Sequence, residues 1–169
     1  MPVSLNNFAP MYARMVDTAA HLLDRGLAYA AENGVSEQEL LGWRLADDMN
    51  PLSFQLAIVV NFSKGWIARA AGVEAPEIVI GADMDVAAFK AAFAEARVFL
   101  DSLATQLSGR DDVAITYKLM DTLEPTQSAG QWITGFATTN IYFHVSMAYA
   151  ILRMRGVPLG KLDMFPKGL

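Results

Sequence analysis

The polar residues best placed for chemistry lie four positions apart in an otherwise apolar segment. Asn140 and His144 share one face of a predicted helix, because residues i and i+4 lie one turn apart. On an earlier predicted helix, Gln55 falls on an apolar face. A buried polar group without a partner costs about 1–3 kcal/mol of stability. We therefore expect Gln55, Asn140 and His144 to converge between the two helices, as candidate residues for binding a small molecule.

Two interpretations of this convergence stay open. The three side chains could satisfy one another, backbone carbonyls or buried water, as polar groups in a core usually do. They could instead line a polar pocket of the kind that helix bundles build from inward-facing side chains. The other histidine, His21, shares a helical face with charged residues, and we expect it to be a solvated surface residue.

The sequence lacks the residues that characterise several classes of enzyme reaction. The chain has no cysteine, which excludes disulfides, thiolate metal sites and a cysteine nucleophile. It has no phosphate-binding glycine loop, no Gly-x-Ser-x-Gly elbow and no His-Glu-x-x-His helix. The net charge of −5 and the scattered lysines and arginines make nucleic acid a poor partner. Whether the chain is an enzyme therefore stays open.

Composition favours a cytoplasmic protein over a membrane protein. The absence of cysteine fits a reducing compartment, and the segment MPVSLNNFAP lacks the pattern of a signal peptide. Residues 125–152 carry no charged side chain and are long enough to span a bilayer. They also carry many amide, hydroxyl and imidazole groups, which would be costly in lipid. A helix buried in a protein core is the better interpretation, and we expect no contact with a membrane.

Four long helices are expected to position these residues, over about residues 8–32, 50–72, 83–109 and 128–155. Asn33-Gly34, Gly72, Gly109 and Gly156 mark their ends, and Asn50-Pro51 marks the start of the second. Residues 113–123 are rich in Ile, Thr and Tyr, which predicts a small β-hairpin turning near Met120-Asp121. Such elements pack most simply as an all-α four-helix bundle, and we expect one domain over residues 1–169.

The last predicted helix is apolar on two sides. Its expected inner stripe consists of Trp132, Phe136, Asn140, Phe143, His144, Met147 and Ile151. A second, more polar stripe holds the aromatic rings of Tyr142 and Tyr149. A helix of this kind is usually covered on both sides. We therefore expect either other parts of the chain or a second copy to cover it, which predicts a homodimer.

Three segments resemble an uncharacterised bacterial domain-of-unknown-function family that belongs with the DinB/YfiT-like four-helix bundles. They are Leu45–Gln55 (LADDMNPLSFQ), Asn61–Gly65 (NFSKG) and Asn140–Gly156 (NIYFHVSMAYAILRMRG). The likeness extends over nearly the whole chain. It implies a DinB-like bundle with up-down-down-up helix order.

The resemblance also implies a metal site. Members of the wider superfamily typically bind a divalent metal through three histidines, one on the second helix and two from a His-x-x-x-His turn on the last. The corresponding residues here are Gln55, Asn140 and His144, so only one imidazole remains, and carboxamides are weak ligands for zinc or nickel. We therefore favour a small-molecule pocket. A transferase or hydrolase dependent on zinc or nickel, and a non-catalytic homodimeric interaction protein, are the alternatives.

Overall fold

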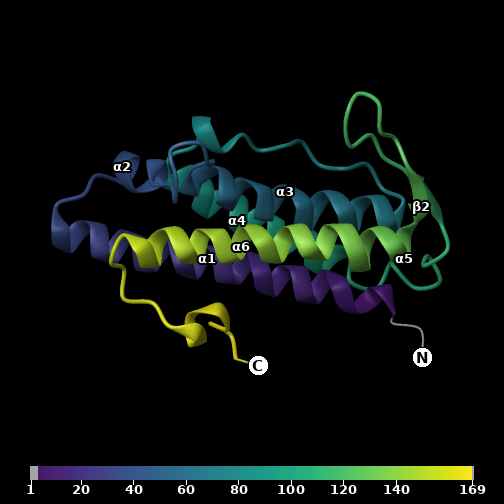
Figure 1. Cartoon of the computed structure of the whole chain (residues 1–169). Coiled ribbons are helices and arrows are strands. Elements are labelled where there is room, and N and C mark those ends of the chain that lie inside the picture. The colour runs from purple at the N-terminus through teal and green to yellow at the C-terminus, as the bar shows by residue number, and fades with distance from the viewer. Residues whose placement is uncertain (1–3, 169) are drawn as a thin grey trace.

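Four long helices form the body of the molecule, for which a computed structural model describes residues 4–168. They are α1 (Phe8–Asn33), α3 (Leu52–Ala71), α4 (Val86–Leu103) and α6 (Thr138–Met154). In Figure 1, α1 and α6 run in one direction, and α3 and α4 run in the other. A long connection leads from the end of α3 back to the start of α4. The predicted all-α four-helix bundle with up-down-down-up order is confirmed.

Shorter elements join and cap the bundle. These are the 3-10 turns η1 (Leu5–Asn7), η2 (Gly81–Asp83) and η4 (Lys161–Met164), the helices α2 (Glu37–Gly42) and α5 (Ala129–Gln131), the π-helical turn η3 (Trp132–Ala137), and the strands β1 (Ala114–Thr116) and β2 (Thr126–Ser128). Helices α5, η3 and α6 follow one another without a break and together form the predicted last helix.

The helix ends follow local signals in the sequence. Gly34 and Gly72 end α1 and α3 in the left-handed conformation, with φ of 70° and 75°, which glycine adopts without steric cost. The side chain of Asp85 accepts a hydrogen bond from the N–H of Ala88 and caps α4. One detail differs: α3 begins at Leu52, and Pro51 takes the extended cap position predicted for its neighbour Asn50.

The predicted hairpin exists, but its second strand lies later in the chain. β1 and β2 pair antiparallel, with Ile115 opposite Gln127. A bridge between Met120 and Leu123 forms the turn between them, close to the predicted position. The indole N–H of Trp132 donates to the carbonyl of Ile115 at 2.8 Å, which holds the hairpin on the end of the bundle.

The buried face of α6 differs from the predicted inner stripe. Within α6 the side chains that reach the core are small or branched: Ile141, Val145, Ala148, Ile151 and Leu152. Trp132 of η3 and Ile151, both on the predicted stripe, are buried as expected. Phe143, placed on the inner stripe by the prediction, has an exposed fraction of 52%, and His144 is only half-buried. The large rings biased the expected stripe, whereas close helix packing selects the small residues on the neighbouring face.

The π-helical turn adds a second cause for this rotation. A π-turn inserts one residue into the helix and shifts the face that later residues present. Tyr12 of α1 stabilises the backbone of the turn. Its hydroxyl donates to the carbonyl of Ile133 at 3.0 Å and lies 2.9 Å from the Thr138 hydroxyl. Burial raises the pKa of Tyr12 well above its ordinary value, and the hydrogen bond to Thr138 only partly offsets this. Tyr12 therefore remains a neutral partner of the turn.

Over residues 4–168, none of the helices combines the length and the apolar character that crossing a bilayer requires.

Candidate functional site

His144 of α6 and Gln55 of α3 meet across the helix interface. His144 Nδ1 lies 2.7 Å from Gln55 Oε1, and Gln55 Nε2 donates to the carbonyl of Asn50 at 2.9 Å. Gln55 is 3% exposed, so its carboxamide relies on these two partners. Two of the three predicted site residues are therefore in direct contact. The hydrogen-bonded side chains of Gln55 and His144 are called the Gln55–His144 pair below.

The hydrogen bonds determine which nitrogen of His144 carries the proton. A backbone carbonyl can only accept, so the NH2 group of Gln55 must face Asn50 and its oxygen must face His144. An amide oxygen also only accepts, so His144 Nδ1 carries the hydrogen and donates it. The neutral ring then has an unprotonated Nε2 with a free lone pair. No residue between 4 and 168 donates a hydrogen bond to that Nε2.

Asn140, the third predicted residue, points its amide elsewhere. Its Nδ2 donates to the carbonyl of Phe136 at 2.8 Å, one turn earlier in the same helix. The side chain is half-buried and lies one turn from His144, without a hydrogen bond to the pair among the described residues. It borders the pair rather than joining it.

The surroundings of His144 are apolar. The ring of Phe54 meets the imidazole edge-on at 6.0 Å between centroids, and Phe143 does so at 5.1 Å. Burial lowers the pKa of His144 to about 4, because the charged form is poorly solvated there. The imidazole is therefore neutral at pH 7 and acts as a hydrogen-bond acceptor through Nε2.

The depressed pKa predicts a loss of stability in acid. The unfolded chain binds a proton at His144 near the ordinary pKa of 6.5, whereas the folded chain does so only near pH 4. The free energy of unfolding should therefore fall as the pH drops from about 6.5 to about 4. Because solvent screens part of the effect at this half-buried side chain, we expect a loss of about 1–2 kcal/mol.

Urea unfolding at pH 7 and pH 4 measures this loss. His144→Phe is the comparison, since it cannot gain a proton and should lose less stability than wild type between the two pH values. Equal losses in the two proteins would show that His144 does not titrate below its ordinary range.

An apolar pocket of about 290 Å³ adjoins the pair. Asn50 and Phe54, which contact Gln55 and His144 respectively, form one end of its lining. The segment 78–82 forms the opposite wall, along the outer side of α3. Asn61 anchors that segment, because its side chain both donates to and accepts from the backbone of Val79 at 2.9 Å.

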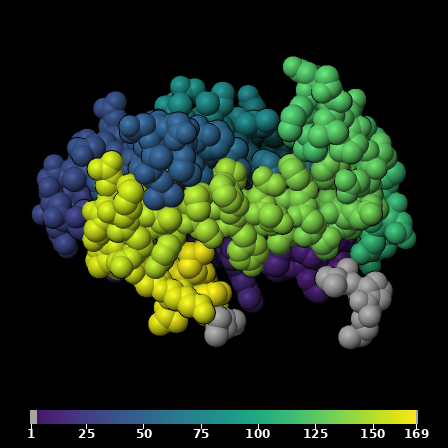
Figure 2. All heavy atoms as spheres, in the orientation of Figure 1, coloured from purple at the N-terminus to yellow at the C-terminus, as the bar shows by residue number. Residues whose placement is uncertain are grey.

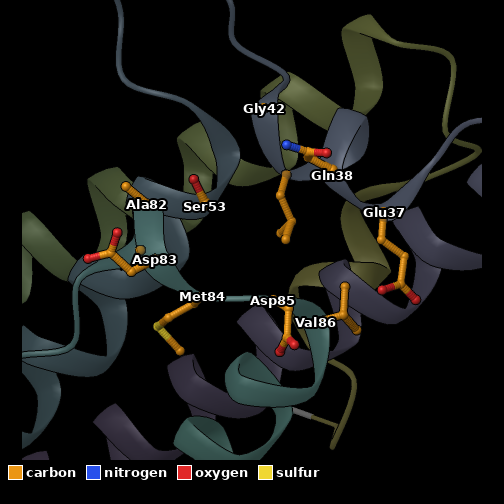
Figure 3. A pocket seen from close by; sticks show the side chains of 11 residues that line it. Glu37, Gln38, Gly42, Ser53, Ala82, Asp83, Met84, Asp85 and Val86 are labelled. Atoms are coloured by element: carbon orange, nitrogen blue, oxygen red, sulfur yellow. The ribbon is translucent and has the colours of Figure 1, made fainter.

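A larger pocket of about 650 Å³ is lined by residues of α2, η2 and the start of α4. Helix α2 lies toward the left in Figure 1. Figure 3 shows Gln38 and Glu37 on one side of the opening and Asp83 and Met84 on the other. Its carboxylates are exposed, and that of Asp85 already caps α4. Neither pocket is lined by Gln55, Asn140 or His144 themselves.

The donor set at the pair does not fit a metal ion. His144 supplies the one imidazole, Gln55 Oε1 is already engaged with Nδ1, and the Asn140 amide is turned to its own helix. Open zinc sites in enzymes normally have three strong protein ligands. Within residues 4–168, no three His, Cys, Asp or Glu side chains come close enough together to hold a metal ion.

His21 is only partly exposed, whereas the sequence predicts a solvated surface residue. Its Nε2 lies 2.8 Å from a carboxylate oxygen of Asp163 in η4, and its side chain is 32% exposed. The backbone N–H of Gly160 and then His21 hold the pKa of Asp163 below its ordinary value. His21 therefore fastens the C-terminal segment to α1, a long-range contact that the helical pattern of α1 could not reveal.

Comparison with known proteins agrees with this architecture. Residues 6–165 match the model of DUF1993, a domain of unknown function. The chain belongs to this family. No curated protein matches the DUF1993 chain. Among solved structures, it is similar to a DinB family member protein from Shewanella denitrificans, with a TM-score of 0.85 and 24% identity over 95% of this chain and 90% of that one. The likeness confirms the predicted DinB-like fold.

Sequence reasoning missed the segment 78–82 as a pocket wall of the DUF1993 chain. Gly81 was the available signal, because a Cβ there would lie 2.4 Å from the Ser53 carbonyl oxygen. Only a glycine permits that approach of the segment to α3. The same residue lines both pockets described above.

Proposed function

We propose that this DinB-like bundle binds a small molecule next to the Gln55–His144 pair, without a metal ion. The hydrogen bond between His144 Nδ1 and Gln55 Oε1 is the observation that carries the proposal. It holds the imidazole in one tautomer and leaves Nε2 free to accept a hydrogen bond. A ligand with a hydroxyl or N–H group and an apolar body matches this arrangement.

The aromatic surroundings support an apolar ligand body. Phe54 joins the pair to the pocket of about 290 Å³, whose lining is mainly apolar. Phe143 is 52% exposed beside the imidazole, which leaves an apolar surface next to His144. A ligand there would bury these rings while its polar group reaches Nε2.

Phenol and anisole form a matched pair of probes for this proposal. Both have one aromatic ring, but only phenol carries a hydrogen-bond donor. We expect phenol to bind about three- to tenfold more tightly than anisole and to shift the NMR signal of His144 Nε2. The chain has two histidines, so the signal of His21, which pairs with Asp163 and not with Gln55, serves as an internal control.

A His144→Phe variant should remove the preference for phenol without removing the ring-binding surface. Retention of the preference by this variant, or equal binding of both probes by wild type, would contradict the proposal. The double variant Gln55→Leu/His144→Phe tests the structural alternative. If the pair serves only the core, this variant should be as stable as wild type and bind both probes unchanged.

The predicted homodimer remains a proposal with one specific support. Tyr142 and Phe143 are 42% and 52% exposed on the outer side of α6, the helix that crosses the face shown in Figure 2. Exposed rings of this kind suit an isologous contact between two copies. Light scattering at micromolar concentration measures the oligomeric state, and a monomer would contradict the proposed homodimer.

A further inference from the structure

A third pocket, of about 110 Å³, lies along α3 next to the pocket of about 290 Å³, with which it shares Ile58, Asn61 and Ile78. Its cations take no part in the proposed function. The outer side of α3, the segment 75–78 and Tyr117 of the hairpin enclose it. In Figure 2 the surface is hollowed between the green hairpin and the blue-teal segments beside it. Phe62, Trp66 and Tyr117 supply aromatic walls, and Ile58 and Ile78 add apolar ones.

Lys64 is the first unusual residue in this pocket. Its side chain is 8% exposed, yet no carboxylate between residues 4 and 168 pairs with it and no described group accepts a hydrogen bond from it. The buried part is the apolar stem, and the cationic head has no partner among the described residues. The ammonium is not sealed from solvent, since it is absent from the fully enclosed unpartnered atoms. A ligand entering the pocket can therefore reach it.

Arg69 supplies a second cation to the same lining. Its guanidinium lies 4.8 Å from the ring centroid of Tyr117 and 5.5 Å from that of Trp66. Stacking on two rings holds the planar group in place and leaves its N–H donors free. Gly65 makes this position available, because a Cβ there would lie 2.7 Å from an Arg69 nitrogen. No carboxylate in the described part of the chain forms an ion pair with Arg69.

The lining has an excess of positive charge. Glu77 is its one acidic residue, so Lys64 and Arg69 together leave a formal charge of +2 − 1 = +1. Glu77 is exposed and contacts neither cation at ion-pair distance. Two cations without ion-pair partners beside aromatic walls suit an anion with an apolar body, since a carboxylate accepts strong charge-assisted hydrogen bonds from either cation.

We propose that this pocket binds a small organic carboxylate with an aromatic body. The carboxylate faces Lys64 and the guanidinium of Arg69. The ring packs against Phe62 and Tyr117, because Trp66 is 2% exposed and already contacts Tyr117 at 4.9 Å between centroids. The small volume restricts the ligand to about one ring. Inorganic phosphate could use the same cations but would leave the aromatic walls without contacts.

Benzoate is the test probe, and benzamide and inorganic phosphate are its comparisons. Titration calorimetry on the full chain should show binding of benzoate at least tenfold tighter than of either comparison, because benzamide lacks the charge and phosphate lacks the ring. Bound benzoate should also change the fluorescence of Trp66. Equal affinity for benzamide, tighter binding of phosphate, or no benzoate binding would overturn the proposal.

Three variants locate the binding. Arg69→Gln and Gly65→Ala should each weaken benzoate binding about tenfold, the first by removing the charge and the second by displacing it. Both leave the buried Lys64 in place, so a folding defect at Lys64 does not confuse the result. Lys118→Gln is the control, because it removes one positive charge from the hairpin outside the pocket and should bind benzoate as wild type does. Unchanged affinity in Arg69→Gln would overturn the proposal.

Discussion

Replacing Gly81 by alanine is expected to lower the free energy of unfolding by about 1–3 kcal/mol. The added Cβ would lie 2.4 Å from the carbonyl oxygen of Ser53 and 2.8 Å from its carbonyl carbon. Both are backbone atoms of α3, so no side chain can rotate away to relieve the overlap. The segment 78–82 must instead move off the helix, which disturbs the contact between Asn61 and Val79.

The same displacement should change both pockets that Gly81 lines. Chemical denaturation measures the free energy of unfolding. The affinity for phenol reports whether the pocket beside the Gln55–His144 pair has changed. Gly135→Ala is the matched control, since Gly135 is an exposed helical glycine with no neighbouring atom within 4 Å of an added Cβ. That change should raise the stability by up to about 1 kcal/mol. Equal stabilities of the two alanine variants would show that the segment adapts without strain.

The helices could be predicted because their signals are local. Gly34 and Gly72 end helices through a backbone conformation that few other residues adopt, and Asp85 caps through its own side chain. Each signal involves residues only a few positions apart. The up-down-down-up order came from the resemblance, because hydrophobic periodicity alone does not say which helices lie side by side.

The contact between Gln55 and His144 could be predicted only in outline. Periodicity places each residue toward the other helices, but the hydrophobicity of the residue type alone favours Phe143 over the smaller Val145 for the core. The π-turn and its partner Tyr12 lie 121 positions apart in sequence, so nothing local reports the shift. The amide of Asn140 bonds to its own helix, an outcome that periodicity cannot distinguish from convergence.

The pocket with two cations could not be predicted from the sequence, for a similar reason. Lys64 and Arg69 belong to one helix but reach one cavity only because the segment 75–78 and Tyr117 close over it. In the sequence they are two of many scattered positive residues. Lys64 differs from the other lysines and arginines in its burial, which distant segments of the chain determine.

Placing histidines at positions 55 and 140, beside His144, should create a zinc site. The double variant Gln55→His/Asn140→His places one imidazole on α3, where Gln55 already lies 2.7 Å from His144, and a second one turn before His144 on α6. Three imidazoles with an open position form a strong zinc ligand set, whereas one imidazole with two carboxamides does not. We expect the affinity for zinc to rise at least about a thousandfold over wild type, with one zinc per chain by elemental analysis.

Two comparisons make this result specific to the interface between α3 and α6. The double variant Gln55→Leu/Asn140→Leu removes the same carboxamides without adding imidazoles and should bind zinc no better than wild type. Adding His21→Gln to the histidine variant should leave the affinity unchanged, because His21 lies at the C-terminal segment with Asp163. Zinc binding by the histidine variant would show that the wild-type chain lacks ligands rather than geometry. Failure of the histidine variant to bind zinc would mean that the turn of α6 carrying Asn140, whose amide already faces its own helix, is rotated too far from α3 to complete a metal site.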